Sequence, residues 1–246
     1  MNTLKEKVII VTGSSKGIGA TIAKTLALKG GSLVINYASS KAEADHVVTE
    51  IINTGGKAIA IKADVSKTEE VKHLFDAAIT HFGKVDILIN NAGISIYKSI
   101  KDTTDEDFNR IFNINVKGTF NTMREAATRL EDGGRVINFS SSVTRLIMPA
   151  YGTYAATKAA VEQMTRVFAK EVGNRNITVN SVSPGPVNTE LFTHGKTDET
   201  IARLASMSVF NRIGETYDIA NVITFLISDE AQWITAQNIG INGGFA

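Results

Sequence analysis

Tyr154 and Lys158 stand four residues apart in the run YGTYAATKAA, and Tyr154 follows Ser141 by thirteen residues. Residues four apart on a helix share a face, so the ammonium group of Lys158 is expected beside the phenol of Tyr154. A free phenol has a pKa near 10 and moves protons poorly at neutral pH, whereas a fixed cation in a partly dehydrated cleft lowers that pKa. The pair is therefore a candidate for acid–base chemistry, although a surface tyrosine and an unrelated lysine have the same spacing.

A glycine-rich run, TGSSKGIG at 12–19, is the second candidate site. It follows a short apolar segment and opens a segment of helical period, where backbone N–H groups and the positive end of a helix dipole bind a pyrophosphate. Glycines let the phosphates approach the backbone, and the spacing lacks the Gly-Lys-Ser/Thr ending of a P-loop. The residues expected to face a dinucleotide are Gly13, Ser15, Lys16, Gly17, Ile18 and Gly19.

The end of the second expected strand bears on which dinucleotide binds. An NAD site usually places a carboxylate there, on the ribose 2′-hydroxyl. From Asn36 onward this chain has no acidic residue until Glu43. Lys16 can pair with a 2′-phosphate that a carboxylate would repel, although Lys16 also fits a solvated loop lysine. NADP(H) is therefore predicted over NAD(H). The residues expected at this end of the site are Asn36, Tyr37, Ala38, Ser39 and Ser40.

Short runs rich in Val and Ile alternate with longer segments of helical period. Strands are expected at 7–12, 33–37, 58–62, 85–90, 135–140, 177–182 and 238–241. Helices are expected at 18–29, 42–54, 71–81, 105–130, 151–172 and 218–227. Continuous apolar strands joined by crossover helices indicate a doubly wound α/β fold with a parallel sheet. We expect one domain over 1–246, with the irregular stretch at about 187–212 acting as a substrate lid.

Composition excludes several other classes. The chain of 246 residues has no cysteine, which excludes disulfides, thiolate catalysis and cysteine–zinc sites, and its four histidines show no metal-ligand spacing, so no metal is expected. The net charge of +1 is scattered, so neither nucleic acid nor a membrane surface is an expected partner. No apolar run fits a membrane span or a signal sequence, and a cytoplasmic protein is expected.

The order of these features resembles the short-chain dehydrogenase/reductase family along essentially the whole chain. The matching residues are TGSSKGIG at 12–19, Asp64-Val65, NNAG at 90–93, Asn115, Ser141, Tyr154, Lys158 and PGPVNT at 184–189. The resemblance implies a Rossmann-type domain with a seven-stranded sheet, assembled as a homotetramer. It also implies adenine, backbone and nicotinamide contacts from these runs. The cofactor-binding residues expected on this basis are Asp64, Val65, Asn91, Ala92, Gly93, Tyr154, Lys158, Pro184, Gly185, Val187 and Thr189.

Family precedent assigns Asn115, Ser141, Tyr154 and Lys158 as a catalytic tetrad. In carbonyl reduction Tyr154 would protonate the oxygen, and Ser141 would donate a hydrogen bond to it as negative charge develops. Lys158 would lower the pKa of Tyr154 and hold the nicotinamide ribose, and Asn115 would anchor a water relay. Tyr151 and Lys158 also have the Y-x6-K spacing of the enoyl-reductase branch. That branch lacks a serine thirteen residues upstream, so Tyr151 is expected to be a pocket wall.

The expected function is an NADPH-dependent carbonyl reductase acting on ketones or secondary alcohols. Bacterial 3-oxoacyl-acyl-carrier-protein reductases are the most similar branch, and their second carrier-binding arginine corresponds to Arg175. The position of the first falls near Asp132, whose carboxylate would repel an acidic carrier, although Arg129 is close by. A carrier-protein reductase, a sugar or polyol dehydrogenase and a non-catalytic dinucleotide-binding protein are the alternatives.

Overall fold

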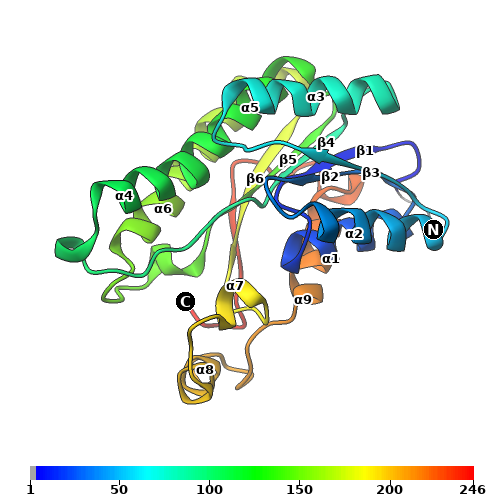
Figure 1. Ribbon diagram of the computed structural model, residues 1–246. Coiled ribbons are helices and arrows are strands. Elements are labelled where there is room, and N and C mark those ends of the chain that lie inside the picture. Colours follow the sequence, from blue (N-terminus) through cyan, green and yellow to red (C-terminus); the bar gives the residue numbers. More distant parts are fainter. Residues whose placement is uncertain (1–3) are drawn as a thin grey trace.

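A sheet of seven parallel strands forms the centre of the protein (Figure 1), in a computed structural model that describes residues 4–246. The strand order is β3-β2-β1-β4-β5-β6-β7. The predicted doubly wound α/β fold is therefore confirmed, and each predicted strand is present to within two residues at either end. The strands are β1 (Val8–Val11), β2 (Ser32–Tyr37), β3 (Lys57–Lys62), β4 (Ile87–Asn90), β5 (Arg135–Phe139), β6 (Thr178–Pro184) and β7 (Asn238–Ile241).

Both faces of the sheet are covered by helices, which explains why the central strands are continuously apolar. Successive residues of a strand point to opposite faces, and in β1 the side chains of Ile9 and Val11 pack on one face while Ile10 packs on the other. The first face is covered by α1 (Gly17–Leu28), α2 (Lys41–Asn53) and α9 (Thr216–Leu226). The second face is covered by α3 (Thr68–Phe82), α5 (Gly118–Arg129) and α6 (Gly152–Glu171).

The strand order reverses at β1, which has β2 and β3 on one side and β4 to β7 on the other. In a doubly wound sheet, ligands bind at the carboxyl edge beside such a reversal, because the connections there diverge to opposite faces. The glycine turn leaves β1 at this edge, and the segment 90–93 ends β4 beside it. The fold therefore brings two of the predicted cofactor runs together.

The long helix expected at 105–130 contains an irregularity that the sequence pattern does not reveal. It consists of α4 (Asp105–Phe112), a π-helical turn (Asn113–Lys117) and α5. A π-helical turn changes the hydrogen-bond spacing from four residues to five and often marks a functional position. This turn contains Asn115, one of the predicted site residues.

The predicted lid segment contains two short helices instead of irregular chain alone. They are α7 (Glu190–Thr193) and α8 (Asp198–Ala205), which lie below the sheet in Figure 1. Each begins at a threonine whose hydroxyl oxygen accepts a backbone N–H: Thr189 from Phe192, and Thr197 from Thr200. These N-caps explain why the helices begin at these positions. Within residues 4–246, no helix is long and apolar enough to cross a bilayer.

Candidate active site

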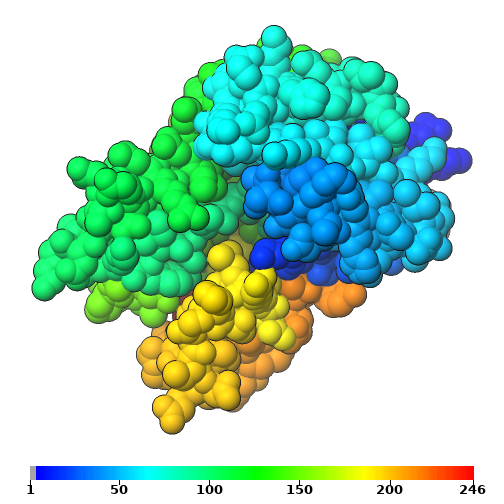
Figure 2. All heavy atoms as spheres, viewed as in Figure 1, coloured from blue at the N-terminus to red at the C-terminus, as the bar shows by residue number. Residues whose placement is uncertain are grey.

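A cleft at the carboxyl edge of the sheet brings residues of the predicted catalytic and cofactor runs together. Figure 2 shows the molecule hollowed where the yellow lid segment meets the blue N-terminal segment and the green segment. The lid itself contributes Leu191, Phe192 and Leu204 to the walls, whereas Met207, Val209 and Phe210 are exposed and lie outside this cleft. The predicted residues that line it are Ile18, Asn91, Gly93, Ser141, Tyr154, Lys158, Pro184, Gly185, Val187 and Thr189.

Tyr154 and Lys158 lie on α6 and both face the cleft, as their spacing predicts. The Nζ of Lys158 lies 5.9 Å from the centre of the Tyr154 ring. It donates a hydrogen bond of 2.8 Å to the carbonyl oxygen of Phe139, the last residue of β5. Ser141, two residues beyond the end of β5, lies in the same cleft. A helix and a strand end therefore deliver the three groups to one place.

The direction of the Tyr154 pKa shift differs from the expectation. Burial raises the pKa of Tyr154 well above the ordinary phenol value, and the neighbouring phenol of Tyr97 acts in the same direction. A hydrogen bond with the Ser141 hydroxyl opposes the rise, and Lys158 is not among the groups that shift it. For the protein alone the pKa shift is therefore upward, because desolvation of the phenolate dominates, and the lowering of this pKa by Lys158 stays a prediction. At neutral pH the Tyr154 hydroxyl is in its protonated form.

Lys158 is one of the few buried cations, with 5% of the residue exposed. Burial lowers the pKa of Lys158 from 10.5 to about 8, because the charged form loses its hydration. The ammonium form therefore still predominates at pH 7, but it is held at a cost in folding free energy. Buried charges kept at such a cost often belong to functional sites.

Asn115 is completely buried behind the cleft, not on its wall. Its amide oxygen accepts the backbone N–H of Ile94 at 2.9 Å, and its amide nitrogen donates to the Ile94 carbonyl at 2.9 Å and to the Thr157 hydroxyl at 3.1 Å. Asn115 thus ties the segment after β4 to α6. Gly93 lies directly in front of it: a Cβ on Gly93 would be 3.2 Å from the Asn115 amide oxygen and 3.4 Å from the Lys158 Nζ. The water relay stays a prediction.

The glycine turn has the backbone geometry that a pyrophosphate needs. Gly13 has φ of +59°, and a Cβ on it would approach the Ala92 Cα to 2.9 Å. A Cβ on Gly19 would lie 2.6 Å from the amide nitrogen of Asn91 and 2.7 Å from the Gly13 carbonyl oxygen. α1 begins after Lys16 with no side-chain cap and no acidic residue in its first turn. Its first N–H groups therefore have no intrahelical partners and suit an anion.

Asn36 supports the glycine turn through a hydrogen bond and does not face the cleft. It is buried, and its amide oxygen accepts the Gly13 backbone N–H at 3.1 Å, while its amide nitrogen donates to the carbonyl oxygens of Ile61 and Ala63. Tyr37 is also buried. By contrast, Ala38 and Ser39 are exposed and Ser40 is half-buried at the end of β2. The accessible groups at this end of the predicted site are therefore these serines and Lys16.

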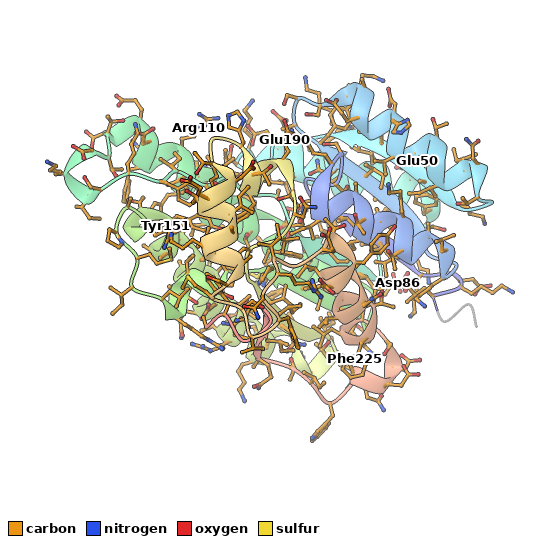
Figure 3. The ribbon with its side chains drawn as sticks, turned by 90° about the horizontal axis from the view of Figure 1, so that it is seen from below. Glu50, Asp86, Arg110, Tyr151, Glu190 and Phe225 are labelled. Atoms are coloured by element: carbon orange, nitrogen blue, oxygen red, sulfur yellow. The ribbon has the colours of Figure 1, made fainter. Side chains whose placement is uncertain are left out.

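Lys16 has a partner that the sequence did not suggest. Its Nζ lies 2.6 Å from a carboxylate oxygen of Glu190, at the start of α7, and both side chains are largely exposed. Figure 3 shows Glu190 on the side of the lid toward the blue N-terminal segment, with Tyr151 on the opposite side. The hydrogen bond from Lys16 lowers the pKa of Glu190. The glycine turn and the lid are thus joined across the cleft by an ion pair.

Two further predicted cofactor residues, Asp64 and Val65, do not line the cleft. The carboxylate of Asp64 accepts hydrogen bonds from the backbone N–H and the hydroxyl of Ser66, so it caps its own loop. Val65 is buried, and a Cβ on Gly118 would approach its side chain to 2.6 Å. Asn91 donates its amide hydrogens to the carbonyl oxygens of Thr12 and Gly13, joining the ends of β1 and β4.

Aromatic rings form one wall of the cleft, and Tyr97 is the member that sequence reasoning missed. Its ring centre lies 4.6 Å from that of Tyr151 and 6.0 Å from that of Tyr154. The Lys196 ammonium, from the lid, lies 4.9 Å from the Tyr97 ring centre and 4.6 Å from that of Phe192. The sequence held no signal for Tyr97, since it lies in an irregular segment. Tyr151 lines the cleft, where a pocket wall was expected.

Both arginines considered for carrier binding are committed to intramolecular contacts. Arg175 donates to the Asp132 carboxylate at 2.7 Å, to the Ala127 carbonyl at 2.8 Å and to the Leu130 carbonyl. Arg129 pairs with the Asp76 carboxylate at 2.6 Å. Asp132, which was expected to repel a carrier, therefore binds Arg175 from the loop before β5.

Comparison with known proteins identifies the family. Residues 13–246 match the family model described as enoyl-(acyl carrier protein) reductase. An NADPH-dependent aldehyde reductase-like protein, chloroplastic, from Arabidopsis thaliana is 45% identical, covering 98% of this chain and 95% of its own. The structure of a short-chain dehydrogenase/reductase from Serratia marcescens BCRC 10948 has a TM-score of 0.95 and 36% identity over 99% of both chains. An angucycline C-6 ketoreductase with bound NADP has a TM-score of 0.94 and 35% identity, covering 99% of this chain and 96% of its own.

The chain belongs to the short-chain dehydrogenase/reductase family and is an oxidoreductase that acts on carbonyl or alcohol groups. Its dinucleotide-binding fold has the cleft at the edge where such folds bind their ligands. In the part of the chain that the structure describes, no group of three or more acidic, histidine or cysteine side chains is arranged to hold a metal.

Proposed function

We propose that the protein is an NADPH-dependent carbonyl reductase of small or apolar ketones and aldehydes. The observation that carries the proposal is the phenol of Tyr154 facing a cleft that it shares with Ser141, Lys158 and the N-terminus of α1. A phenol kept protonated at neutral pH is the form needed to donate a proton to a carbonyl oxygen. NADPH, when bound, supplies a hydride to the carbonyl carbon.

Each residue has a role that follows from its position. Ser141 hydrogen-bonds the substrate oxygen and stabilises the negative charge that develops there. Tyr154 gives its proton to that oxygen, and the Lys158 ammonium one helical turn away stabilises the phenolate that forms. Asn115 holds the backbone at Ile94 and thereby the shape of the cleft wall. Hydrogen bonds from first-turn N–H groups of α1, at Gly17 to Gly19, hold the pyrophosphate.

NADP(H) is favoured over NAD(H) by the charges at the end of β2. No carboxylate follows Tyr37 before Glu43, and the groups available there are the hydroxyls of Ser39 and Ser40 and the ammonium of Lys16. The bridge from Lys16 to Glu190 is solvent-exposed and therefore weak, so a dianionic 2′-phosphate competes for Lys16 effectively. The Arabidopsis relative is named as NADPH-dependent, and the ketoreductase structure holds NADP.

A free carbonyl compound is favoured over an acyl-carrier thioester. Arg175 and Arg129 are paired with carboxylates of the same chain, so neither presents an uncompensated cation to an acidic carrier. The cleft walls near Tyr154 are apolar and aromatic, from Tyr97, Phe192 and the other lid residues described above. Such walls suit an apolar substrate. We infer that the segment 187–212 closes over that substrate, with Lys196 packed on the Tyr97 ring.

We also propose a homotetramer in the cytoplasm. Large apolar side chains are exposed on neighbouring helices, with Phe108 on α4, Phe120 on α5 and Val167 on α6 each nearly half exposed. Apolar surface of this kind is often covered by a second subunit. Light scattering of the purified protein tests the assembly, and a monomer contradicts it. The cysteine-free composition is compatible with a reducing compartment.

The test is a panel of ketones, aldehydes, secondary alcohols and an acyl-carrier thioester, followed by NADPH and NADH absorbance. We expect turnover of free carbonyl compounds, with kcat/KM higher for NADPH than for NADH. Tyr154→Phe should lower kcat by at least about 100-fold while NADPH binding, measured by fluorescence, is retained. Tyr151→Phe is the matched control and should keep kcat within about threefold. Loss of activity in Tyr151→Phe with full activity in Tyr154→Phe contradicts the assignment.

A further inference from the structure

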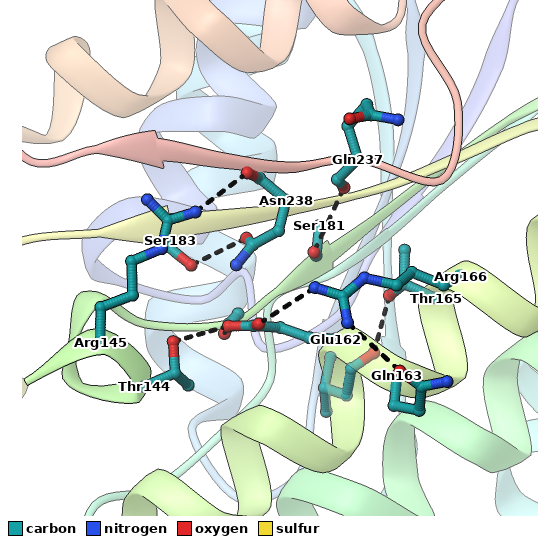
Figure 4. Close-up of polar contacts among 12 residues, drawn as sticks. Thr144, Arg145, Glu162, Gln163, Thr165, Arg166, Ser181, Ser183, Gln237 and Asn238 are labelled. Carbon is teal, nitrogen blue, oxygen red and sulfur yellow. Dashed lines mark hydrogen bonds and ion pairs between the residues drawn. The ribbon is translucent and has the colours of Figure 1, made fainter.

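Glu162 lies one helical turn beyond Lys158 on α6, so Tyr154, Lys158 and Glu162 follow one another at intervals of four along one stripe of the helix. The Glu162 side chain is only 12% exposed. Its Oε1 accepts the Ser140 hydroxyl at 2.6 Å and the Thr144 hydroxyl at 2.7 Å, and Figure 4 shows the second of these bonds. These lengths are typical of a hydroxyl that donates to an ionised carboxylate.

The two donors lie on either side of Ser141. Ser140 precedes it, with its backbone N–H bound to the Val182 carbonyl oxygen at 2.8 Å in the sheet. The hydroxyl of Thr144 lies 3.0 Å from the carbonyl oxygen of Ser141, and its backbone N–H donates to the same oxygen at 3.2 Å. Apart from its hydrogen bond with the Tyr154 phenol, the Ser141 hydroxyl has only a long bond of 3.4 Å from the Val143 N–H. The position of Ser141 therefore depends on its neighbours, and Glu162 holds both of them.

We propose that Glu162 is a positioning residue that holds the Ser141 hydroxyl in register with Tyr154. The inference rests on the proposed carbonyl reduction, in which both hydroxyls meet one substrate oxygen. α6 carries Tyr154 directly and holds the Ser141 segment through Glu162, so one rigid helix sets both positions. A displacement of about 1 Å at a reacting group can cost about 100-fold in rate. Supporting residues with satisfied hydrogen bonds prevent such displacements.

An ion pair within the helix is the simpler role for Glu162, and the distances argue against it. The closest cation, Arg166, lies 3.8 Å from Oε2 and is half exposed. Figure 4 shows this contact beside the shorter bond to Thr144. Exposed pairs four apart on a helix contribute little to stability. The two short bonds at Oε1 hold the side chain inward, toward the Ser141 segment.

The test compares Glu162→Gln with Glu162→Leu. The amide oxygen of Gln can accept both hydroxyls, so Glu162→Gln should keep kcat within about threefold of wild type. Glu162→Leu removes the one acceptor that the two hydroxyls share, and kcat should fall about 10- to 100-fold with the NADPH Kd unchanged. Gln163→Ala, on the exposed side of the same helix, is the matched control and should change neither quantity. Equal loss in Glu162→Gln and Glu162→Leu overturns the proposal, because the acceptor would then be irrelevant.

A double-mutant cycle separates positioning from a general structural effect. If Glu162 acts through Ser141, then Glu162→Leu should lower kcat by less than about threefold in a Ser141→Ala background. Full additivity of the two losses overturns the proposal. Should Glu162→Leu not fold, Thr144→Val removes one of the two hydroxyl donors, and the same cycle applies to it.

Crystal structures give a readout that does not depend on turnover. We expect the Ser141 hydroxyl to move by about 1 Å or more in Glu162→Leu and to stay in place in Glu162→Gln. An unmoved Ser141 in Glu162→Leu overturns the positioning role even if the enzyme is active. Absence of turnover in the wild-type protein, with Ser141 displaced in the variant, contradicts the proposed function instead.

Discussion

Replacing Lys158 by methionine is expected to stabilise the protein while removing its activity. Methionine keeps an unbranched side chain of similar length and removes a cation that is 5% exposed. Burial lowers the pKa of Lys158 from 10.5 to about 8, a shift of roughly 2.5 units, which corresponds to about 3 kcal/mol of folding free energy lost by the wild type at pH 7. The substitution also leaves the Phe139 carbonyl without its donor, at a cost of about 1–3 kcal/mol. The net gain is therefore about 1 kcal/mol at pH 7.

The pH dependence is the sharper test, because the lost hydrogen bond does not enter it. Between pH 8 and 10.5 the unfolded chain holds the Lys158 proton and the folded protein releases it, so wild-type stability rises with pH relative to the variant. From pH 7 to pH 9.5 the wild type should gain roughly 2 kcal/mol on Lys158→Met. Above about pH 10.5 the penalty is absent, and below pH 8 it is almost fully present.

Urea unfolding of the cofactor-free protein at both pH values, at one protein concentration, measures this difference. Lys170→Met, at an exposed position of the same helix, is the matched control and should show a pH-independent difference. A stability difference between wild type and Lys158→Met that is the same at pH 7 and pH 9.5 would refute the reasoning. The kcat of Lys158→Met should be lower than that of the wild type by at least about 100-fold. A gain in stability with a loss of activity is common when a destabilising functional group is removed.

Three further predictions concern the cofactor site and the lid. Gly19→Ala places a Cβ 2.6 Å from the side-chain amide nitrogen of Asn91, so NADPH affinity, measured by fluorescence titration, should fall more than about tenfold. Gly173→Ala is the control and should leave this affinity unchanged, because no heavy atom lies within 4 Å of its Cβ. Lys16→Ala should weaken NADPH binding severalfold more than NADH binding, and an equal effect on both Kd values would remove Lys16 from the 2′-phosphate site. Lys196→Met removes the ammonium that packs on the rings of Tyr97 and Phe192. The KM for the carbonyl substrate should rise about two- to fivefold, with the NADPH Kd unchanged. An unaltered KM would mean that this contact does not hold the lid.

The strands and most helices were predictable because each leaves a local pattern. A strand buried on both faces must be apolar along its length, and β1 and β4 have that composition. The glycine turn was also predictable, because only glycine fits where a Cβ would meet backbone atoms at less than 3 Å. The π-helical turn at Asn115 was not, since its five residues include no proline or glycine that would mark an irregularity in the helix. The short lid helices were missed for a different reason: with four and eight residues, they are too short to give a clear periodic pattern.

The sequence by itself determined the fold class, the carboxyl-edge location of the site and the i, i+4 pairing of Tyr154 with Lys158, because these follow from local periodicity and chain order. The tertiary structure alone decided how those groups behave. The pKa of Tyr154 rises because burial and Tyr97, from a distant segment, act on it. Lys16 pairs with Glu190, which lies 174 residues away along the chain. Ser140 donates a hydrogen bond to Glu162, which lies 22 residues away. Desolvation and such long-range pairs depend on which surfaces the folded chain brings together, and no spacing rule in the sequence encodes them.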